Sequence, residues 1–148
     1  MYKFTASVFI NRPPQEVFDF ITDPANTAKY QSSTESAEWV TEGPPGVGSI
    51  FKTKVKFLGR MIEANVQVIG WDPARMYAAK TISGPIPFES TTRLEPQGEG
   101  TLVTDTIQAE LGGFFKLAEG MVGKQLEKTV ETDHSALKLI LEAGQMES

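Results

Sequence analysis

The chain begins with a segment in which apolar and polar residues alternate. Within residues 2–10, one side collects Tyr2, Phe4, Ala6, Val8 and Ile10, and the polar residues Lys3, Thr5 and Ser7 lie on the other. Because successive side chains of a strand point to opposite faces, this pattern predicts a half-buried strand. Residues 49–59 alternate even more regularly, with Phe51, Thr53, Val55 and Phe57 on one face and lysines on the other. This segment is the clearest strand of the sequence.

Five further segments combine alternation with flanking turn residues, and we predict them as strands: 36–42, 60–71, 76–82, 88–95 and 101–111. Segment 60–71 follows a turn at Gly59, which makes it the hairpin partner of 49–59, and Ile62, Ala64, Val66 and Val68 should face inward. Asp72-Pro73 and the Gln-Gly-Glu-Gly sequence at 97–100 mark two more turns. The sequence therefore predicts a sheet built mainly from hairpins.

Helical patterns occur in two places. Residues 11–24 can form a short helix, with Asn11 as a cap, prolines in the first turn and Pro24 as the end, and residues 25–31 can add a second short turn or helix. From Phe114 to about Ala143 the period becomes helical, and one face collects Phe115, Val122, Leu126, Val130, Leu137, Ile140 and Leu141. We predict an α+β fold in one domain, residues 1–148, with a single antiparallel sheet.

A glycine-rich segment, Thr41 to Ser49, resembles at first a loop that binds phosphate. Pro44 and Pro45 lack the backbone N–H groups that such a loop directs at the anion, and no Gly-Lys-Ser/Thr sequence follows. The segment that comes after it is a predicted strand, where a phosphate loop leads into a helix. We interpret it as a turn between two strands, and we do not expect nucleotide binding.

Composition narrows the classes of function. The chain has 148 residues, a net charge of −5 and no cysteine. The negative charge argues against nucleic acid as a partner, and the lack of cysteine excludes disulfides, thiolate metal sites and cysteine nucleophiles. Neither a signal peptide nor a run of about 18 apolar residues is evident, so no transmembrane segment is expected and the expected location is cytoplasmic. Nothing in the sequence defines the oligomeric state.

The order of elements and several short motifs resemble the START-like superfamily, also called SRPBCC or the birch-pollen-allergen fold. The motifs are the helix sequence PPQEVFDFITDP, Gly46-Val47-Gly48, GWDPAR at 70–75, SGPIPFESTTRLEP and GTLVTDT. The polyketide cyclase/dehydrase branch is the more similar one. The resemblance implies a helix-grip fold, in which a curved antiparallel sheet of about seven strands wraps around the long C-terminal helix, with two short helices after the first strand. It also implies an apolar cavity between sheet and helix, bordered by the glycine-rich turn.

A physical argument supports such a cavity, since a long helix laid on a curved sheet cannot contact it everywhere. Gly120 and Gly123 lack side chains, so we expect open space beneath the first half of the helix and a filled second half. The alternative is that aromatic side chains fill the space. The candidate ligand-binding residues are Tyr30, Phe51, Val55, Phe57, Val66, Phe88, Asp105, Ile107, Phe115, Glu119, Val122 and Leu126.

Three acids fall on faces that are otherwise apolar: Asp105, Glu119 and Asp133. A carboxylate desolvated in a cavity has a raised pKa and can act as a general acid or base. Each also has a structural interpretation: Glu119 stabilises the helix N-terminus, Asp133 pairs with a basic side chain, and Asp105 faces outward if the strand register differs by one. Asp133, His134 and Ser135 are adjacent on a helix and diverge by about 100°, so they cannot form a catalytic triad.

Three hypotheses on function remain open. The leading one is the binding of a hydrophobic or amphipathic small molecule, with Tyr30, Asp105 and Glu119 as polar anchors. The second is a polyketide cyclase/dehydrase-type enzyme that works without a cofactor and uses a cavity acid. The third is an accessory or chaperone-cofactor module, which would have a filled core and an exposed apolar patch. No metal site is expected, because a single histidine without cysteine leaves only scattered carboxylates.

Overall fold

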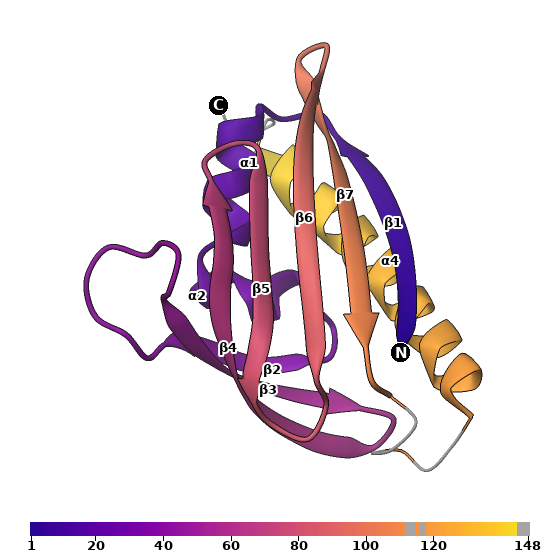
Figure 1. Ribbon diagram of the computed structural model, residues 1–148. Coiled ribbons are helices and arrows are strands. Elements are labelled where there is room, and N and C mark those ends of the chain that lie inside the picture. The colour runs from indigo at the N-terminus through magenta and orange to yellow at the C-terminus, as the bar shows by residue number, and fades with distance from the viewer. Residues whose placement is uncertain (112–114, 116–117, 145–148) are drawn as a thin grey trace.

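The computed structural model describes residues 1–111, 115 and 118–144, and it contains one curved sheet with helices on one of its faces (Figure 1). The seven strands are β1 (Tyr2–Ile10), β2 (Thr34–Trp39), β3 (Ile50–Phe57), β4 (Arg60–Asp72), β5 (Met76–Ser83), β6 (Phe88–Gln97) and β7 (Gly100–Ala109). The helices are α1 (Pro14–Ile21), α2 (Pro24–Tyr30) and α4 (Glu119–Ala143). The predicted α+β helix-grip fold is confirmed.

The sheet is antiparallel throughout, in the order β1-β7-β6-β5-β4-β3-β2. Five of its neighbour pairs are hairpins or short connections between consecutive strands, as the turn signals predict. The sixth pair joins β1 to β7, where Phe4 lies opposite Ile107 and Val8 opposite Val103. This long-range pair places the amino-terminal strand at one edge of the sheet and β2 at the other.

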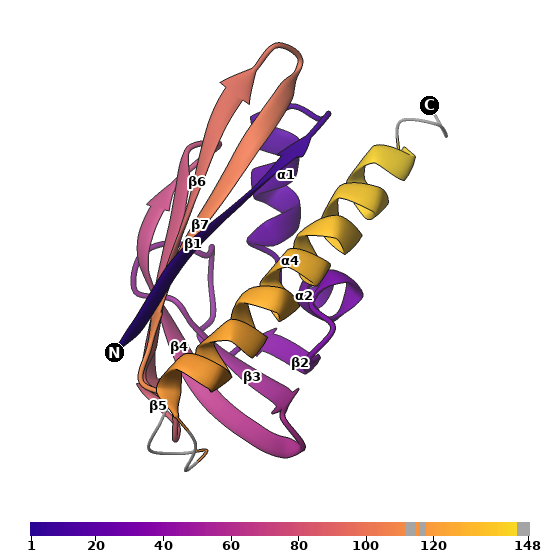
Figure 2. The same ribbon diagram turned by 90° about the vertical axis from the view of Figure 1, so that its right-hand side faces the viewer.

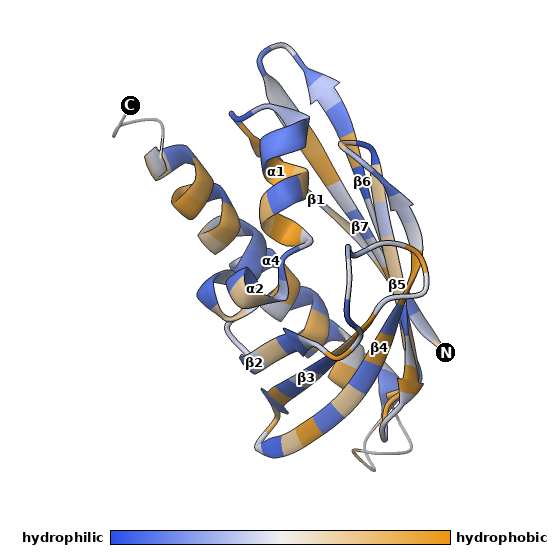
Figure 3. Ribbon diagram, turned by 90° about the vertical axis from the view of Figure 1, so that its left-hand side faces the viewer, coloured by the Kyte–Doolittle hydropathy of each residue, from blue (hydrophilic) through white to orange (hydrophobic). Residues whose placement is uncertain are grey.

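Alternation along the strands turns one face of the sheet toward the helices. Figure 3 shows hydrophilic and hydrophobic residues alternating along β3 and β4. In β4 the residues predicted to face inward are all buried: Ile62, Ala64, Val66 and Val68. Burial of such side chains stabilises each by roughly 1.5–3 kcal/mol, which fixes the register of these strands.

Helix α4 runs diagonally across the inner face of the sheet, with α1 and α2 beside it (Figure 2). Two clusters of buried side chains lie at its two ends. Around α1 the cluster contains Ile10, Val17, Phe18, Leu94, Val103, Leu137 and Leu141. Near the start of α4 it contains Phe57, Ile62, Ala109, Leu111, Phe115 and Val122. The space between these clusters is where the candidate site lies.

Several predicted boundaries are corrected by the structure. The cap of α1 is Pro13 and not Asn11, and it makes no side-chain hydrogen bond, because prolines set the backbone of the first turn. Strand β2 covers Thr34–Trp39 and not 36–42, since the N–H groups of Val40 and Thr41 both point to the carbonyl of Ile50. Helix α4 begins at Glu119, and the predicted start at Phe114 lies outside the described residues. Ile140, placed on the apolar face by its spacing, is exposed.

Candidate ligand-binding cavity

A cavity of about 320 Å³ lies between the sheet and α4. Its walls come from strands β2 to β7, from α2 and the residues that follow it, and from the middle of α4. This volume lies at the lower end of the ~300–1,000 Å³ range typical of small-molecule sites. Aromatic side chains contribute to the wall without filling the space.

Nine of the twelve predicted ligand-binding residues line this cavity. They are Tyr30, Phe51, Val55, Phe57, Val66, Phe88, Asp105, Ile107 and Leu126. Within one strand, the lining residues are separated by an even number of positions, and they therefore share the inward face. The structure thus brings together residues from several segments of the chain that the alternating pattern alone placed on one face.

The other three predicted residues lie outside the cavity lining. Phe115 and Val122 are buried in the cluster at the start of α4, where the rings of Phe115 and Phe57 meet edge to face with centroids 5.4 Å apart. Glu119 is the first residue of α4, and one carboxylate oxygen lies 3.3 Å from the amino nitrogen of Met1. Its position agrees with the helix-terminus interpretation more than with a cavity anchor.

The cavity lies beneath the middle of α4 and not beneath its first half as expected. The lining residues of this helix are Leu126, Thr129, Val130, Asp133, His134 and Leu137. Gly123 does not open space toward the cavity, because it allows close packing of Tyr2: a Cβ atom there would lie 2.3 Å from the ring. The glycine-rich loop at 41–49 does not border the cavity either, contrary to the expectation from the resemblance.

A polar cluster interrupts the apolar wall at Asp105. His134 Nε2 lies 2.6 Å from Asp105 Oδ2, and Thr92 donates its hydroxyl proton to Asp105 Oδ1. Because an ionised carboxylate only accepts hydrogen bonds, the ring nitrogen of His134 is the donor in this pair. His134 is therefore held by a specific partner, and Asp105 faces inward as its strand position indicated.

Asp133 is the second carboxylate of the cavity wall. It does not pair with a basic side chain as suggested above; its Oδ1 atom accepts from the backbone N–H of Ser32 at 2.9 Å and from the Ser32 hydroxyl at 2.8 Å. Burial raises the pKa of Asp133 above its ordinary value of 3.8, while the two hydrogen bonds from Ser32 and the neighbouring His134 act in the opposite direction. These bonds connect α4 to the segment between α2 and β2.

Two tyrosines complete the polar part of the wall. Burial raises the pKa of Tyr30 above its ordinary value of 10.0, and the negative charge of Asp105 adds to this effect. Burial likewise raises the pKa of Tyr77. Both phenols are therefore protonated at neutral pH and can donate or accept a hydrogen bond.

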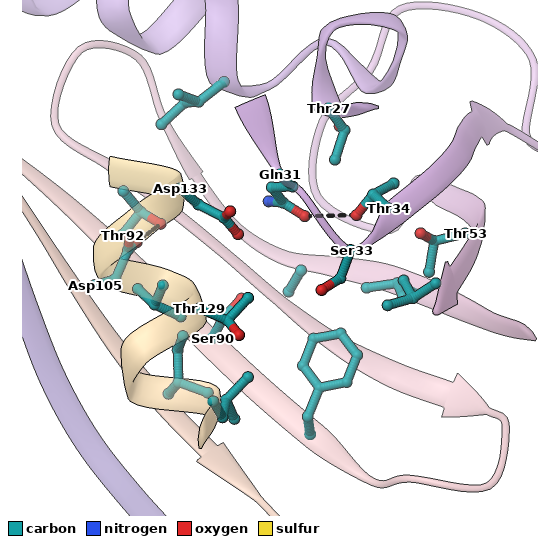
Figure 4. Close-up of a pocket in the computed structure, with 18 of the residues that line it drawn as sticks. Thr27, Gln31, Ser33, Thr34, Thr53, Ser90, Thr92, Asp105, Thr129 and Asp133 are labelled. Atoms are coloured by element: carbon teal, nitrogen blue, oxygen red, sulfur yellow. Dashed lines mark hydrogen bonds between the residues drawn. The ribbon is translucent and has the colours of Figure 1, made fainter. Parts of the chain in front are cut away.

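Several polar lining residues were not among the predicted ligand-binding residues: Thr22, Thr27, Gln31, Ser33, Thr34, Thr53, Ser90, Thr92 and Thr129. Of these, only Thr53 had been placed on the inward face, by its alternation with Phe51 and Val55. Figure 4 shows two groups of them, one from α2, β2 and β3 and one around Asp105 and α4. Strand parity could have found Ser90 and Thr92, because they share a face with Phe88. No comparable signal existed for Gln31, Ser33 and Thr34, whose positions depend on where α2 ends.

The described residues lack two features that would point to other kinds of site. Within residues 1–111, 115 and 118–144, no group of three or more His, Cys, Asp and Glu side chains has an arrangement suited to a metal ion. Among the same residues, no helix combines the length and apolar character needed to cross a membrane.

A curved antiparallel sheet that grips a long helix, with a cavity between them, is the architecture of START-like domains. The chain belongs to the family described as polyketide cyclase / dehydrase and lipid transport, whose sequence profile matches residues 1–142. No curated protein sequence matches the chain significantly. The family membership confirms the resemblance inferred from the sequence.

Solved structures with the same fold cover nearly the whole chain. The protein TTHA0849 from Thermus thermophilus is 23% identical with a TM-score of 0.83, covering 97% of this chain and 99% of its own. A START superfamily protein from Mycobacterium smegmatis is 15% identical with a TM-score of 0.81, covering 97% and 99%. The Zhui aromatase/cyclase from Streptomyces sp. R1128 is 20% identical with a TM-score of 0.70, covering 95% and 93%. At these identities the likeness concerns the fold alone.

Proposed function

We propose that the protein binds a hydrophobic or amphipathic small molecule in the cavity between the sheet and α4. The observation that carries this proposal is the cavity itself, about 320 Å³ of space bounded mainly by apolar side chains with a few polar groups. Apolar walls favour the transfer of apolar surface from water at roughly 25 cal/mol per Å². Polar groups at fixed positions would orient the bound molecule.

Ligand retention during purification tests this proposal. Native mass spectrometry of protein never exposed to added ligand should report a bound molecule, or the protein should take up a neutral fluorescent probe such as N-phenylnaphthylamine. Substitution Ser90→Leu should abolish uptake by filling the cavity. The control is Thr91→Leu, because this neighbouring residue of β6 points to the other face of the sheet. Absence of ligand and probe in the unaltered protein would refute the proposal.

A second candidate function is cofactor-independent catalysis of the cyclase or dehydratase kind. The pair formed by Asp105 and His134 in the cavity wall favours it, because a carboxylate that holds an imidazole is a common arrangement for general acid–base chemistry. In this case a polyketide-like substrate would leave the protein altered in mass by the loss of water, and Asp105→Asn would stop the conversion with little change in melting temperature. A bound molecule that is always recovered unaltered would favour binding alone.

A further inference from the structure

We propose that the cavity selects uncharged amphipathic molecules that carry a hydrogen-bond donor, such as alcohols and phenols, and discriminates against carboxylates. This inference rests on the proposed function, because it names the chemical class of ligand for the same cavity. It is carried by the charges and hydrogen bonds of the described lining residues.

The charges of the cavity wall are unfavourable for a bound carboxylate. Within the described part of the lining, the ionisable side chains are Tyr30, Tyr77, Asp105, Asp133 and His134, with neither lysine nor arginine. The basic group among them, His134, already donates to Asp105 at 2.6 Å. A carboxylate that entered would therefore meet two resident carboxylates, and no lysine or arginine of the described lining would offset its charge.

Many hydroxyl protons of the cavity wall are already engaged in hydrogen bonds within the protein. Five threonines of the lining direct their protons to protein acceptors: Thr22 to the Phe18 carbonyl, Thr34 to Gln31 Oε1, Thr53 to the Ser36 carbonyl, Thr92 to Asp105 Oδ1 and Thr129 to the Gln125 carbonyl. A hydroxyl whose proton is engaged offers a neighbour only its lone pairs. These groups therefore act as acceptors toward the cavity, as the carboxylates do.

The remaining lining hydroxyls do not change this balance. Thr27, Ser33, Ser90, Tyr30 and Tyr77 can each donate or accept, and the side-chain amide of Gln31 is a further neutral donor, so these groups can bond an alcohol or phenol. A neutral donor brings no countercharge, however, and a buried carboxylate without one is costly. A guest that donates to Asp105, Asp133 or a threonine oxygen gains a hydrogen bond without burying a new charge. Figure 4 shows Asp105, Asp133 and Thr129 beside α4, and Thr34 and Thr53 in a second group at β2 and β3.

The resident carboxylates support the same conclusion. Burial already raises the pKa of Asp133, so the environment of this side chain disfavours negative charge even with two hydrogen bonds from Ser32. A negatively charged ligand in the cavity would be repelled by the carboxylate of Asp133, and this repulsion is stronger in a medium of low dielectric constant than in water.

Three ligands of similar shape test the inference: naphthol, naphthoate and naphthalene, each competing with N-phenylnaphthylamine at neutral pH, where naphthoate is ionised. We expect naphthol to bind about tenfold or more tightly than naphthoate, and more tightly than naphthalene, as one hydrogen bond to a charged acceptor would give. If naphthoate binds as well as naphthol or better, the inference is overturned while the proposed function stands. If the protein binds no probe and none of the three, the proposed function itself fails.

Variants assign the selectivity to the cavity carboxylates. Asp105→Asn and Asp133→Asn should each strengthen naphthoate binding several-fold and reduce the preference for naphthol. The matched control is Glu89→Gln, which removes the same unit of charge from the exposed face of β6 and should leave the preference unchanged. Using both aspartates guards against one variant that fails to fold. An equal effect of all three variants would show that net charge and not the cavity sets the preference, which would overturn the inference.

Discussion

Asp133 is a buried carboxylate whose two hydrogen bonds hold α4 against the segment between α2 and β2. Both bonds end on one oxygen, Oδ1, so an asparagine at this position can keep them. What asparagine lacks is the charge, and burial opposes that charge in the folded protein. The residue therefore combines a useful hydrogen-bond geometry with an unfavourable ionisation.

We expect the stability of Asp133→Asn relative to the unaltered protein to increase with pH. The folded pKa of Asp133 lies above the unfolded value near 3.8, so the folded state binds the proton more tightly. The unaltered protein therefore loses stability as pH rises from the unfolded to the folded pKa, and the loss is complete above it. Asparagine cannot titrate and avoids the loss. Urea denaturation of both proteins at about pH 4 and pH 7 measures the difference.

A companion variant, Ser32→Ala, provides the control. It removes the hydroxyl bond that lowers the pKa of Asp133, and it should therefore enlarge the pH dependence that Asp133→Asn removes. If the difference in the free energy of unfolding between the unaltered protein and Asp133→Asn is the same at both pH values, burial does not disfavour the charge of Asp133 in the way described.

The sequence predicted the positions of some residues in the cavity wall, but it did not predict their hydrogen-bond partners. Phe51, Val55 and Phe57 line the cavity as predicted, because the period of a strand is local information. The partners of Asp105 and Asp133 were not predictable, since His134 and Ser32 reach them through long-range packing. Sequence spacing states which face a residue occupies but not which side chain it will meet there.

At the scale of elements, close packing between α4 and β1 depends on Gly123. The ring of Tyr2 lies against this glycine, and the Tyr2 hydroxyl donates to Glu127 on the next turn of the helix. This contact fixes the start of α4 over the edge of the sheet. The same contact explains why the cavity lies farther along the helix than the glycine positions suggested: the space beside Gly123 is occupied by an aromatic ring.

We expect Gly123→Ala to destabilise the protein by about 1–3 kcal/mol, because the new Cβ would lie 2.3 Å from the Tyr2 ring and displace it. Helix propensity alone predicts the opposite, a gain of ~1 kcal/mol. Gly120→Ala is the matched control, since a Cβ there meets nothing within 4 Å, and its stability should be unchanged or slightly raised. Urea denaturation distinguishes the two.

A Tyr2→Ala background tests the cause of that loss. Without the ring, Gly123→Ala should no longer destabilise the protein, and a double-mutant cycle should return a coupling of the same size as the original loss. A cost that persists in this background would place the strain elsewhere.

At the scale of the whole molecule, the cavity joins three parts of the chain. The sheet forms its floor, α4 its cover, and the segment from α2 to β2 one side. The hairpin neighbours from β2 to β7 and the covering helix were predictable, since they follow from local periods and turn residues, whereas the pairing of β1 with β7 was not, because it joins residues about 100 positions apart. The size and depth of the cavity were not, because they depend on how a curved sheet and a helix meet.

A ligand in this cavity should stabilise all three parts together. We expect hydrogen–deuterium exchange to slow at α2, at 126–137 of α4 and along β3 to β6 when naphthol is bound, because opening any wall would release the ligand. The variant Ser90→Leu should not respond to naphthol. Protection confined to a single surface element would instead indicate that the ligand binds outside the cavity.

The pairing of β1 with β7 has a consequence for how the protein is made. Residues 2–10 pair with residues 101–109, so during translation β1 is synthesised about 100 residues before its only neighbour in the sheet. The cover of the inner face, α4, emerges later still. A nascent chain therefore cannot complete this sheet and its cover until β7 and α4 have both left the ribosome, and the unpaired strands are prone to aggregation until then.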